Sequence, residues 1–154
     1  MKILILGAGR VGESVAESLV SEQNDITVID TDPQRLALLQ DRMDLRGVVG
    51  NGIQPSVLRE AGAEDADMLI ACAPLDETNL VACKIAHDQF RIQTRIARVR
   101  SPEFTDGSEL MRPEGFAVDE AIRRAGRLGE LDLAWIEEPL PADDIEGHVR
   151  LSNS

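Results

Sequence analysis

The stretch LILGAGRVG, Leu4–Gly12, decides the fold of this chain. It joins an apolar run to three glycines spaced Gly-x-Gly-x-x-Gly, and apolar residues at helical spacing follow it. In such a context Gly7 permits a tight turn, Gly9 lets the backbone approach a phosphate, and Gly12 lets the helix pack close to the sheet. The N–H groups and the partial positive charge of a helix N-terminus attract an anion. The stretch therefore predicts a strand, a phosphate-binding turn and a helix.

The rest of the first hundred residues alternates between the two periodicities. Strands are expected at 2–6, 25–30, 45–49, 67–73 and 95–99. Helices are expected after Gly12, from 32 to 43, from 55 to 61 and from 76 to 90. This order predicts an α/β fold, a Rossmann-like doubly wound parallel sheet with helices on both faces. After a break at 101–115, residues 116–118 are expected to add a short sixth strand.

Length and charge narrow the classes of function. The 154 residues allow one domain with an appendage. The formal net charge of −12 argues against a nucleic-acid partner and against binding to an anionic membrane surface. No apolar run approaches the roughly 20 residues of a membrane span, and the strand that starts at once indicates no signal peptide. Cys72 and Cys83 are expected as buried free thiols of a cytoplasmic protein.

Two charged residues extend the glycine motif. Asp30 ends the second predicted strand, about twenty residues after the loop, where an acid hydrogen-bonds ribose hydroxyls and repels a 2′-phosphate. That favours NAD over NADP but does not separate NAD from ATP or ADP; the alternative is that Asp30 only caps the next turn. Arg10 is placed to reach a terminal phosphate as a charge-assisted donor. Its alternative role is that of an ordinary solvated residue at a helix start.

The residues needed for catalysis are missing from the sequence. The chain has no tyrosine, so it lacks the Tyr/Lys dyad of short-chain dehydrogenases. His87 is expected inside a helix, away from the strand ends where a substrate would lie. The sequence has no zinc-ligand cluster, no Gly-x-Ser-x-Gly elbow and no Walker A lysine. We therefore expect a protein that binds a nucleotide without catalysis.

Several consecutive motifs carry a family resemblance. They are MKILILGAGRVG, NDITVIDTDPQRL, LQDRMDLRGVVGNG, VLREAGAEDADMLIAC, DETNLVACKIA and RIARVRSPEF, with TDGSELMRPEGFAVDE as a looser match. Over residues 1–119 the chain resembles the N-terminal nucleotide-binding domain of the TrkA (RCK/KTN) family of potassium uptake regulators. The resemblance implies a cytoplasmic module, peripheral at the inner face of the plasma membrane, whose partner is a Trk-type potassium channel subunit. It also implies a homodimer or ring that binds NAD(H) or ATP/ADP without turning them over.

The same resemblance assigns roles to individual residues. Gly7, Gly9 and Gly12 would cradle the phosphate, Arg10 would contact a terminal phosphate, and Val11 would also belong to the cofactor-binding residues. Asp30 and Thr31 would take the ribose, Arg35 would flank the adenine, and Asn51 and Gly52 would lie beside the base. Ala71, Cys72 and Ala73 would end the fourth strand under the cofactor, and Arg98 would contact phosphate or serve the dimer interface. No catalytic and no metal-binding residue is expected.

The end of the chain departs from that family. Residues 121–152, which contain WIEEP, resemble a fragment of the mandelate-racemase/enolase superfamily, in which Glu137 would be a magnesium ligand. One carboxylate does not hold Mg²⁺ and one βα unit does not close a barrel, so enolase chemistry is not expected. We expect a chimera: a nucleotide-binding domain at 1–119 and an appended αβα segment at 120–154. Its predicted elements are a helix at 120–131, a strand at Leu133–Glu137 and a helix from Ala142.

Three functional alternatives stay open. The first is a regulatory nucleotide-binding domain of a Trk-type potassium uptake system. The second is a natural or engineered chimera that keeps nucleotide binding but regulates nothing. The third is a small NAD-dependent oxidoreductase, which would need an acid or base beside the nicotinamide.

Overall fold

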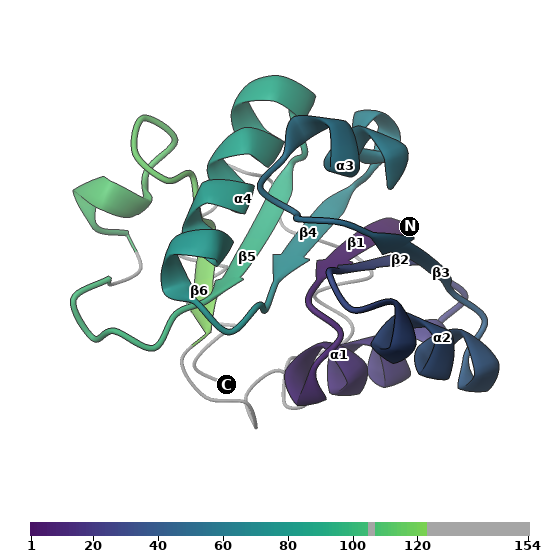
Figure 1. Ribbon diagram of the computed structural model, residues 1–154. Coiled ribbons are helices and arrows are strands. Elements are labelled where there is room, and N and C mark those ends of the chain that lie inside the picture. The colour runs from purple at the N-terminus through teal and green to yellow at the C-terminus, as the bar shows by residue number, and fades with distance from the viewer. Residues whose placement is uncertain (105–106, 123–154) are drawn as a thin grey trace.

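In the part of the chain that the structure describes, six parallel strands form one sheet in the order β3-β2-β1-β4-β5-β6 (Figure 1). The computed structural model describes residues 1–104 and 107–122. The strands are β1 (Lys2–Leu6), β2 (Asp25–Asp30), β3 (Arg46–Val49), β4 (Met68–Ala71), β5 (Thr94–Arg98) and β6 (Glu120–Ile122). The predicted doubly wound parallel sheet is confirmed, and its strand order reverses between β1 and β4. In sheets of this kind ligands bind at such a reversal, outside the carboxyl ends of the strands.

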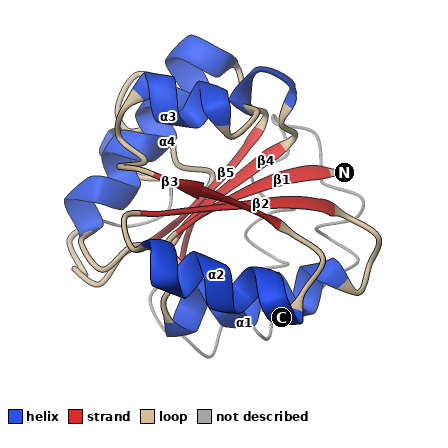
Figure 2. Ribbon diagram, turned by 45° about the vertical axis from the view of Figure 1, so that its right-hand side comes forward, coloured by secondary structure: helices blue, strands red, loops and turns tan. Residues whose placement is uncertain are grey.

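Helices cover both faces of the sheet (Figure 2). The helices are α1 (Arg10–Val20), α2 (Pro33–Arg42), α3 (Pro55–Glu60) and α4 (Asp76–Phe90), with 3₁₀ turns η1 (Ala63–Asp65) and η2 (Glu109–Met111). On one face α1 and α2 pack on one set of strand side chains, among them Ile3, Ile5 and Val28. On the other face α3 and α4 pack on the alternate set, which includes Leu4 and Leu69. Because neighbouring residues of a strand point to opposite faces, strands buried on both faces read as continuous apolar runs.

The sixth strand lies at 120–122, so the prediction of a strand at 116–118 was wrong. Ala117 has a left-handed φ of 56°. The N–H of Ala117 donates to the carbonyl of Arg112, and that of Val118 to the carbonyl of Met111. These local hydrogen bonds use the donors that a strand would offer to β5, so the segment forms turns. The predicted helix at 120–131 was wrong over 120–122, and the other elements of the αβα segment lie outside the described residues.

Arg95 fixes the position of β6. Its backbone N–H and its Nη2 donate to the two carboxylate oxygens of Asp119, at 2.6 and 3.1 Å. Its Nε donates to the carbonyl of Ala117 at 2.6 Å, and Asp119 N–H returns a bond to the carbonyl of Arg95. The Arg95 side chain is almost fully buried. This network sets the register in which Glu120 pairs with Ile96.

Candidate nucleotide-binding site

The glycine loop is shaped by a segment distant in sequence. Gly7 has a φ of +107°, and a Cβ there would lie 2.9 Å from the carbonyl oxygen of Cys72. A Cβ on Gly12 would lie 1.8 Å from the carbonyl oxygen of Gly7. A Cβ on Gly9 would meet nothing within 4 Å. The fold itself therefore requires glycine at positions 7 and 12. Gly9 faces open space, which is what we expect of a residue whose backbone a phosphate approaches.

The N-terminus of α1 offers donors to an anion. The first helical hydrogen bond runs from the N–H of Glu13 to the carbonyl of Gly9, at 2.9 Å. Within residues 1–104 and 107–122, the N–H groups of Arg10, Val11 and Gly12 have no hydrogen-bond acceptor. Unpaired N–H groups at a helix start, with the helix dipole behind them, are the usual site for a phosphate group.

Asp30 stands beside this loop at the end of β2. Its Oδ2 accepts the N–H of Ala8 at 2.7 Å, and its Oδ1 accepts the N–H of Asp32 at 2.7 Å. The alternative weighed for Asp30, a cap on the turn after β2, is therefore part of what it does. Each carboxylate oxygen has two acceptor positions, so one remains on each for a ligand hydroxyl.

A pocket of about 370 Å³ opens at the carboxyl ends of the strands. It is bordered by Asp30 and, on the other side of β1, by the segment that follows β4. The predicted site residues that line it are Gly7, Asp30, Thr31, Arg35, Asn51, Gly52 and Ala73. The structure thus gathers these residues, which come from four separate parts of the chain, around one hollow.

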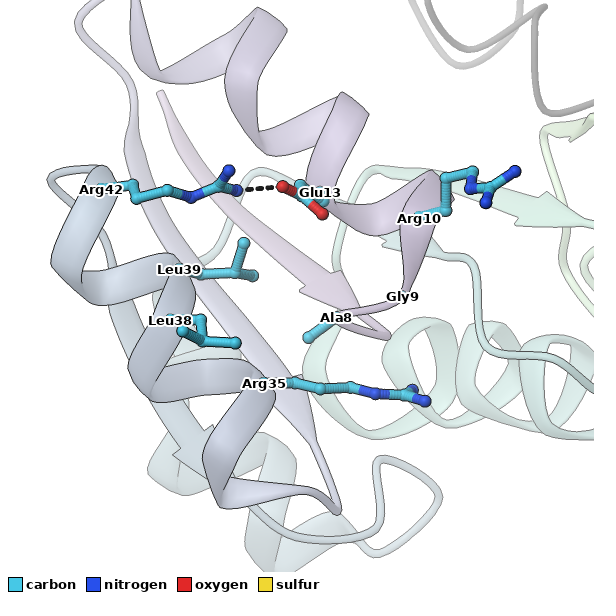
Figure 3. A pocket seen from close by; sticks show the side chains of 8 residues that line it. All are labelled: Ala8, Gly9, Arg10, Glu13, Arg35, Leu38, Leu39 and Arg42. Carbon is cyan, nitrogen blue, oxygen red and sulfur yellow. Dashed lines mark hydrogen bonds and ion pairs between the residues drawn. The ribbon is translucent and has the colours of Figure 1, made fainter.

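A second pocket, of about 450 Å³, lies between α1 and α2 on the other side of the loop (Figure 3). Gly9, Arg10 and Arg35 line it, and Arg35 also lines the first pocket. The Arg42 guanidinium is paired with the carboxylate of Glu13, whereas the Arg10 and Arg35 side chains extend toward one side of the view. Arg35 lies 3.6 Å from a carboxylate oxygen of Asp32. Within the described residues, Arg10 is therefore the arginine of this pocket that takes part in no ion pair.

Five of the predicted site residues line neither pocket: Val11, Gly12, Ala71, Cys72 and Arg98. Val11 is on the buried face of α1 and packs in the core. β4 ends at Ala71, and alternation turns Cys72 toward α1, away from Ala73. Burial raises the pKa of the Cys72 thiol to about 12, although the nearby Arg98 guanidinium opposes this. Of residues 71–73, only Ala73 lines the pocket, and their place under the cofactor stays a prediction.

Arg98 lies at the end of β5, on the face that carries Ile96 and α1. Its Nε is buried, and no hydrogen-bond partner for it is present in the part of the chain that the structure describes. A phosphate contact or an interface role for Arg98 stays a prediction.

Sequence reasoning missed part of the pocket wall. The missed residues are Leu6, Ile29, Gly50, Pro74, Leu75 and Thr78. A signal for Pro74 to Thr78 was available, because the loop after β4 borders the point where strand order reverses. Leu6 and Ile29 look like ordinary strand residues in the sequence, and only the assembled sheet shows that they face the hollow.

The TrkA-N domain family matches residues 3–123. The chain belongs to this family. A Trk system potassium uptake protein TrkA from Halomonas elongata is 52% identical over 122 residues, covering 79% of this chain and 27% of that protein. The TrkA of Azorhizobium caulinodans is 40% identical over 147 residues, covering 94% of this chain and 32% of that protein. This TrkA-N chain therefore spans between about a quarter and a third of the length of these relatives.

Solved structures share the fold of the TrkA-N chain. The TrkA-N domain of the inner membrane protein ybaL from Escherichia coli matches with a TM-score of 0.69 and 22% identity, over 90% of this chain and 96% of that one. The GsuK channel bound to NAD matches with a TM-score of 0.64 and 22% identity, over 79% and 21% of the two chains. GsuK bound to ADP gives the same TM-score with 21% identity, over 79% and 31%. At these identities the likeness concerns the fold alone.

One of the TrkA relatives also aligns with part of the C-terminal segment. The Azorhizobium caulinodans match covers 94% of this chain, so it extends beyond residue 123. The predicted origin of residues 121–152 from a second parent gains no support from that match. It stays a prediction, as does the division of the chain at residue 119.

Proposed function

We propose that this chain is the nucleotide-binding regulatory domain of a Trk-type potassium uptake system. The observation that carries the proposal is the glycine loop, whose unpaired N–H groups at the start of α1 stand next to the Asp30 carboxylate. A phosphate and a ribose hydroxyl are the groups that such a pair recognises. The TrkA proteins that share 40% and 52% of their aligned residues with this chain give the cellular context.

The ligand is NAD(H) or an adenine nucleotide such as ATP or ADP. Asp30 suits the unmodified adenosine ribose that these molecules share, and its charge disfavours a 2′-phosphate. The GsuK channel, which has the same fold, was solved with NAD and with ADP. Arg10 and Arg35 would select among these ligands by the charge of the phosphates that reach the second pocket.

Binding without catalysis is supported by the residues around the ligand pocket. Asp30 and Arg35 are the titratable residues among those that line it, and both Asp30 oxygens already accept backbone N–H groups. His87 lies near the far end of α4, where its Nδ1 is 2.8 Å from the Oδ1 of Asp88. A nucleotide held there would act as a signal that biases the conformation of the assembly.

The proposed setting is the inner face of the plasma membrane. We place the domain in a homodimer or ring that contacts the membrane potassium channel subunit. In the described parts of the chain, no helix combines the length and the apolar character needed to cross a membrane. A peripheral position would suit the net charge of −12, which disfavours direct contact with anionic lipid.

A calorimetric titration with ATP, ADP, NAD⁺ and NADH tests the proposal. We expect at least one of them to bind, and Asp30→Ala to weaken that binding at least tenfold, the effect of about 1.4 kcal/mol. Asp25→Ala, at the exposed amino end of the same strand, is the matched control and should bind as the wild type does. A wild-type chain that binds none of the four nucleotides rules the proposal out, and hydride turnover would favour an oxidoreductase.

A further inference from the structure

We propose that Asp76 and Asn79, on the first turn of α4, are positioning residues that couple occupancy of the nucleotide pocket to the loop after β5. The inference rests on the proposed function, because it concerns what a bound nucleotide does to the rest of the domain. It names residues that neither line the pocket nor belong to the glycine motif.

Asn79 is a buried polar residue, 1% exposed, whose amide joins two loops. Its Oδ1 accepts the N–H of Ala73 at 2.8 Å, and its Nδ2 donates to the carbonyl of Ala73 at 3.0 Å. The same Nδ2 donates to the carbonyl of Arg98 at 2.8 Å. Both backbone groups of Ala73 lie past the last residue of β4, so a side chain replaces the sheet partner there. One amide therefore holds the pocket wall and the end of β5 together.

Asp76 makes the corresponding contacts one turn earlier on α4. Its Oδ1 accepts the N–H of Arg100 at 2.8 Å, and its Oδ2 accepts the N–H of Ser101 at 2.9 Å. The carboxylate thus binds two consecutive backbone donors in the loop that follows β5. Bidentate binding of this kind fixes both the position and the direction of a loop.

The first turn of α4 also belongs to the pocket. Leu75 precedes the helix and Thr78 lies between Asp76 and Asn79, and both residues line the hollow. A ligand that presses on Ala73, Leu75 or Thr78 therefore acts on a rigid turn whose other side chains hold residues 98–101. Because Arg100 and Ser101 do not line the pocket, this turn gives their amides a route by which to respond to a nucleotide.

The experiment uses amide NMR spectra of the full chain with and without saturating ADP. In the wild type, ADP should shift the amide signals of Arg100 and Ser101 as well as that of Ala73. Asp76→Ala should still bind ADP, with nearly wild-type affinity by calorimetry, and should lose the shifts at Arg100 and Ser101. The shift at Ala73 should remain, because Asn79 is intact. A purely structural role of Asp76 would not alter which amides respond to ADP.

Glu77→Ala is the matched control. Glu77 is an exposed acid on the same turn, and no hydrogen bond joins its side chain to the described residues. Its removal takes one negative charge from the N-terminus of α4, as the removal of Asp76 does. It should keep every ADP-dependent shift. Asn79→Ala should weaken ADP binding and lose the shifts at both loops; if it does not fold, Asp76→Ala alone decides.

Each outcome has a definite meaning. ADP binding in the wild type without shifts at Arg100 and Ser101, or shifts that persist in Asp76→Ala, overturns the coupling and leaves the proposed function intact. A wild-type chain that binds neither ADP nor ATP, NAD⁺ or NADH overturns the proposed function, and the coupling with it.

Discussion

The carboxylate of Asp30 accepts the backbone N–H of Ala8 at 2.7 Å. Ala8 lies within the glycine loop, between Gly7 and Gly9, whereas Asp30 ends the neighbouring strand. The acid that lines the ligand pocket therefore also holds the loop expected to bind phosphate. Because one side chain does both, a change at Asp30 affects loop shape and ligand recognition together, and the two effects must be measured separately.

Asp30→Asn should separate the two roles of this residue. The amide keeps one oxygen acceptor but presents its NH₂ group to the other backbone N–H, so we expect a loss of about 1–2 kcal/mol in unfolding free energy. Removal of the negative charge should weaken NAD⁺ binding and raise NADP⁺ binding relative to it. Urea denaturation and calorimetry measure the two effects, with Asp25→Asn as control. An unchanged ratio of NADP⁺ to NAD⁺ affinity would contradict the ribose role.

Gly12→Ala should mainly lower stability, whereas Gly9→Ala should mainly weaken ADP binding. A Cβ at Gly12 would lie 1.8 Å from the Gly7 carbonyl oxygen, so we expect a loss of more than about 3 kcal/mol in stability. A Cβ at Gly9 meets nothing within 4 Å and the backbone there is extended, so this variant should lose no more than about 1 kcal/mol, the cost of alanine at a helix N-cap. It should nevertheless bind ADP more weakly, because the methyl group occupies the path of the phosphate. Thermal unfolding and ADP titration test the pair, and equal stability losses would refute this division.

The sequence predicted most of the sheet because the strands at its centre are buried on both faces. Runs such as KILIL in β1 and DITVID in β2 predict both a buried strand and the length of that strand. The pocket lining contains Gly7, Asp30 and Asn51, all of them at strand ends, where the topology rule places a ligand. Turn residues and polar residues at strand ends are visible in a sequence, so these parts could be predicted.

The rest depends on contacts between distant residues. The register of β6 is set by Arg95 and Asp119, which are 24 positions apart, and nothing in the sequence around either residue indicates that they pair. Cys72 was placed under the cofactor on the strength of the family resemblance, whereas in the structure β4 ends at Ala71 and the Cys72 side chain packs in the core on the side of α1. The contacts of Asp76 and Asn79 to two separate loops have no signature in the sequence either, since acids and amides in a first helical turn are usually read as caps.

Arg10 and Arg42 provide a test of phosphate selectivity. Within the described residues Arg10 takes part in no ion pair, whereas Arg42 is paired with Glu13 and lies 3.9 Å from Glu17. We expect Arg10→Ala to lower ATP affinity about tenfold while NAD⁺ affinity changes much less. Arg42→Ala should leave both unchanged. Equal losses of ATP and NAD⁺ affinity in Arg10→Ala would reject a contact with the terminal phosphate.

The two thiols should make stability fall in alkaline solution. Burial raises the pKa of Cys72 and that of Cys83 to about 12. The folded state thus keeps both protons above the pKa of the unfolded thiols, near 8.5, while the unfolded chain loses them. Unfolding free energy should therefore decline as pH rises from about 9 to 12, by up to ~1.4 kcal/mol per pH unit for each thiol.

A double variant isolates the contribution of these thiols. Cys72→Ala combined with Cys83→Ala should be less stable at pH 7 but should show a flatter decline above pH 9 in urea denaturation. Single variants should lie between it and the wild type. A decline of unchanged steepness in the double variant would show that other groups cause the alkaline loss.

The Arg95–Asp119 pair should matter far more than an exposed pair. Asp119→Ala leaves the buried Arg95 guanidinium without its carboxylate, for which we expect a loss of about 3–5 kcal/mol. The control is Asp65→Ala, which removes the 2.8 Å partner of Lys2 at the surface and should barely move the unfolding midpoint. Urea denaturation compares the two, and similar midpoints would mean that the network around β6 is dispensable.

The contact between Gly7 and the Cys72 backbone makes the phosphate loop a product of three strands. The turn that follows β1 is closed by Ile29 from β2 on one side and by Cys72, just after β4, on the other. A chain that lacked β4 would carry the complete glycine motif without the backbone that packs against Gly7. The motif alone therefore does not specify the shape of its own turn, because residues far away in the sequence complete it.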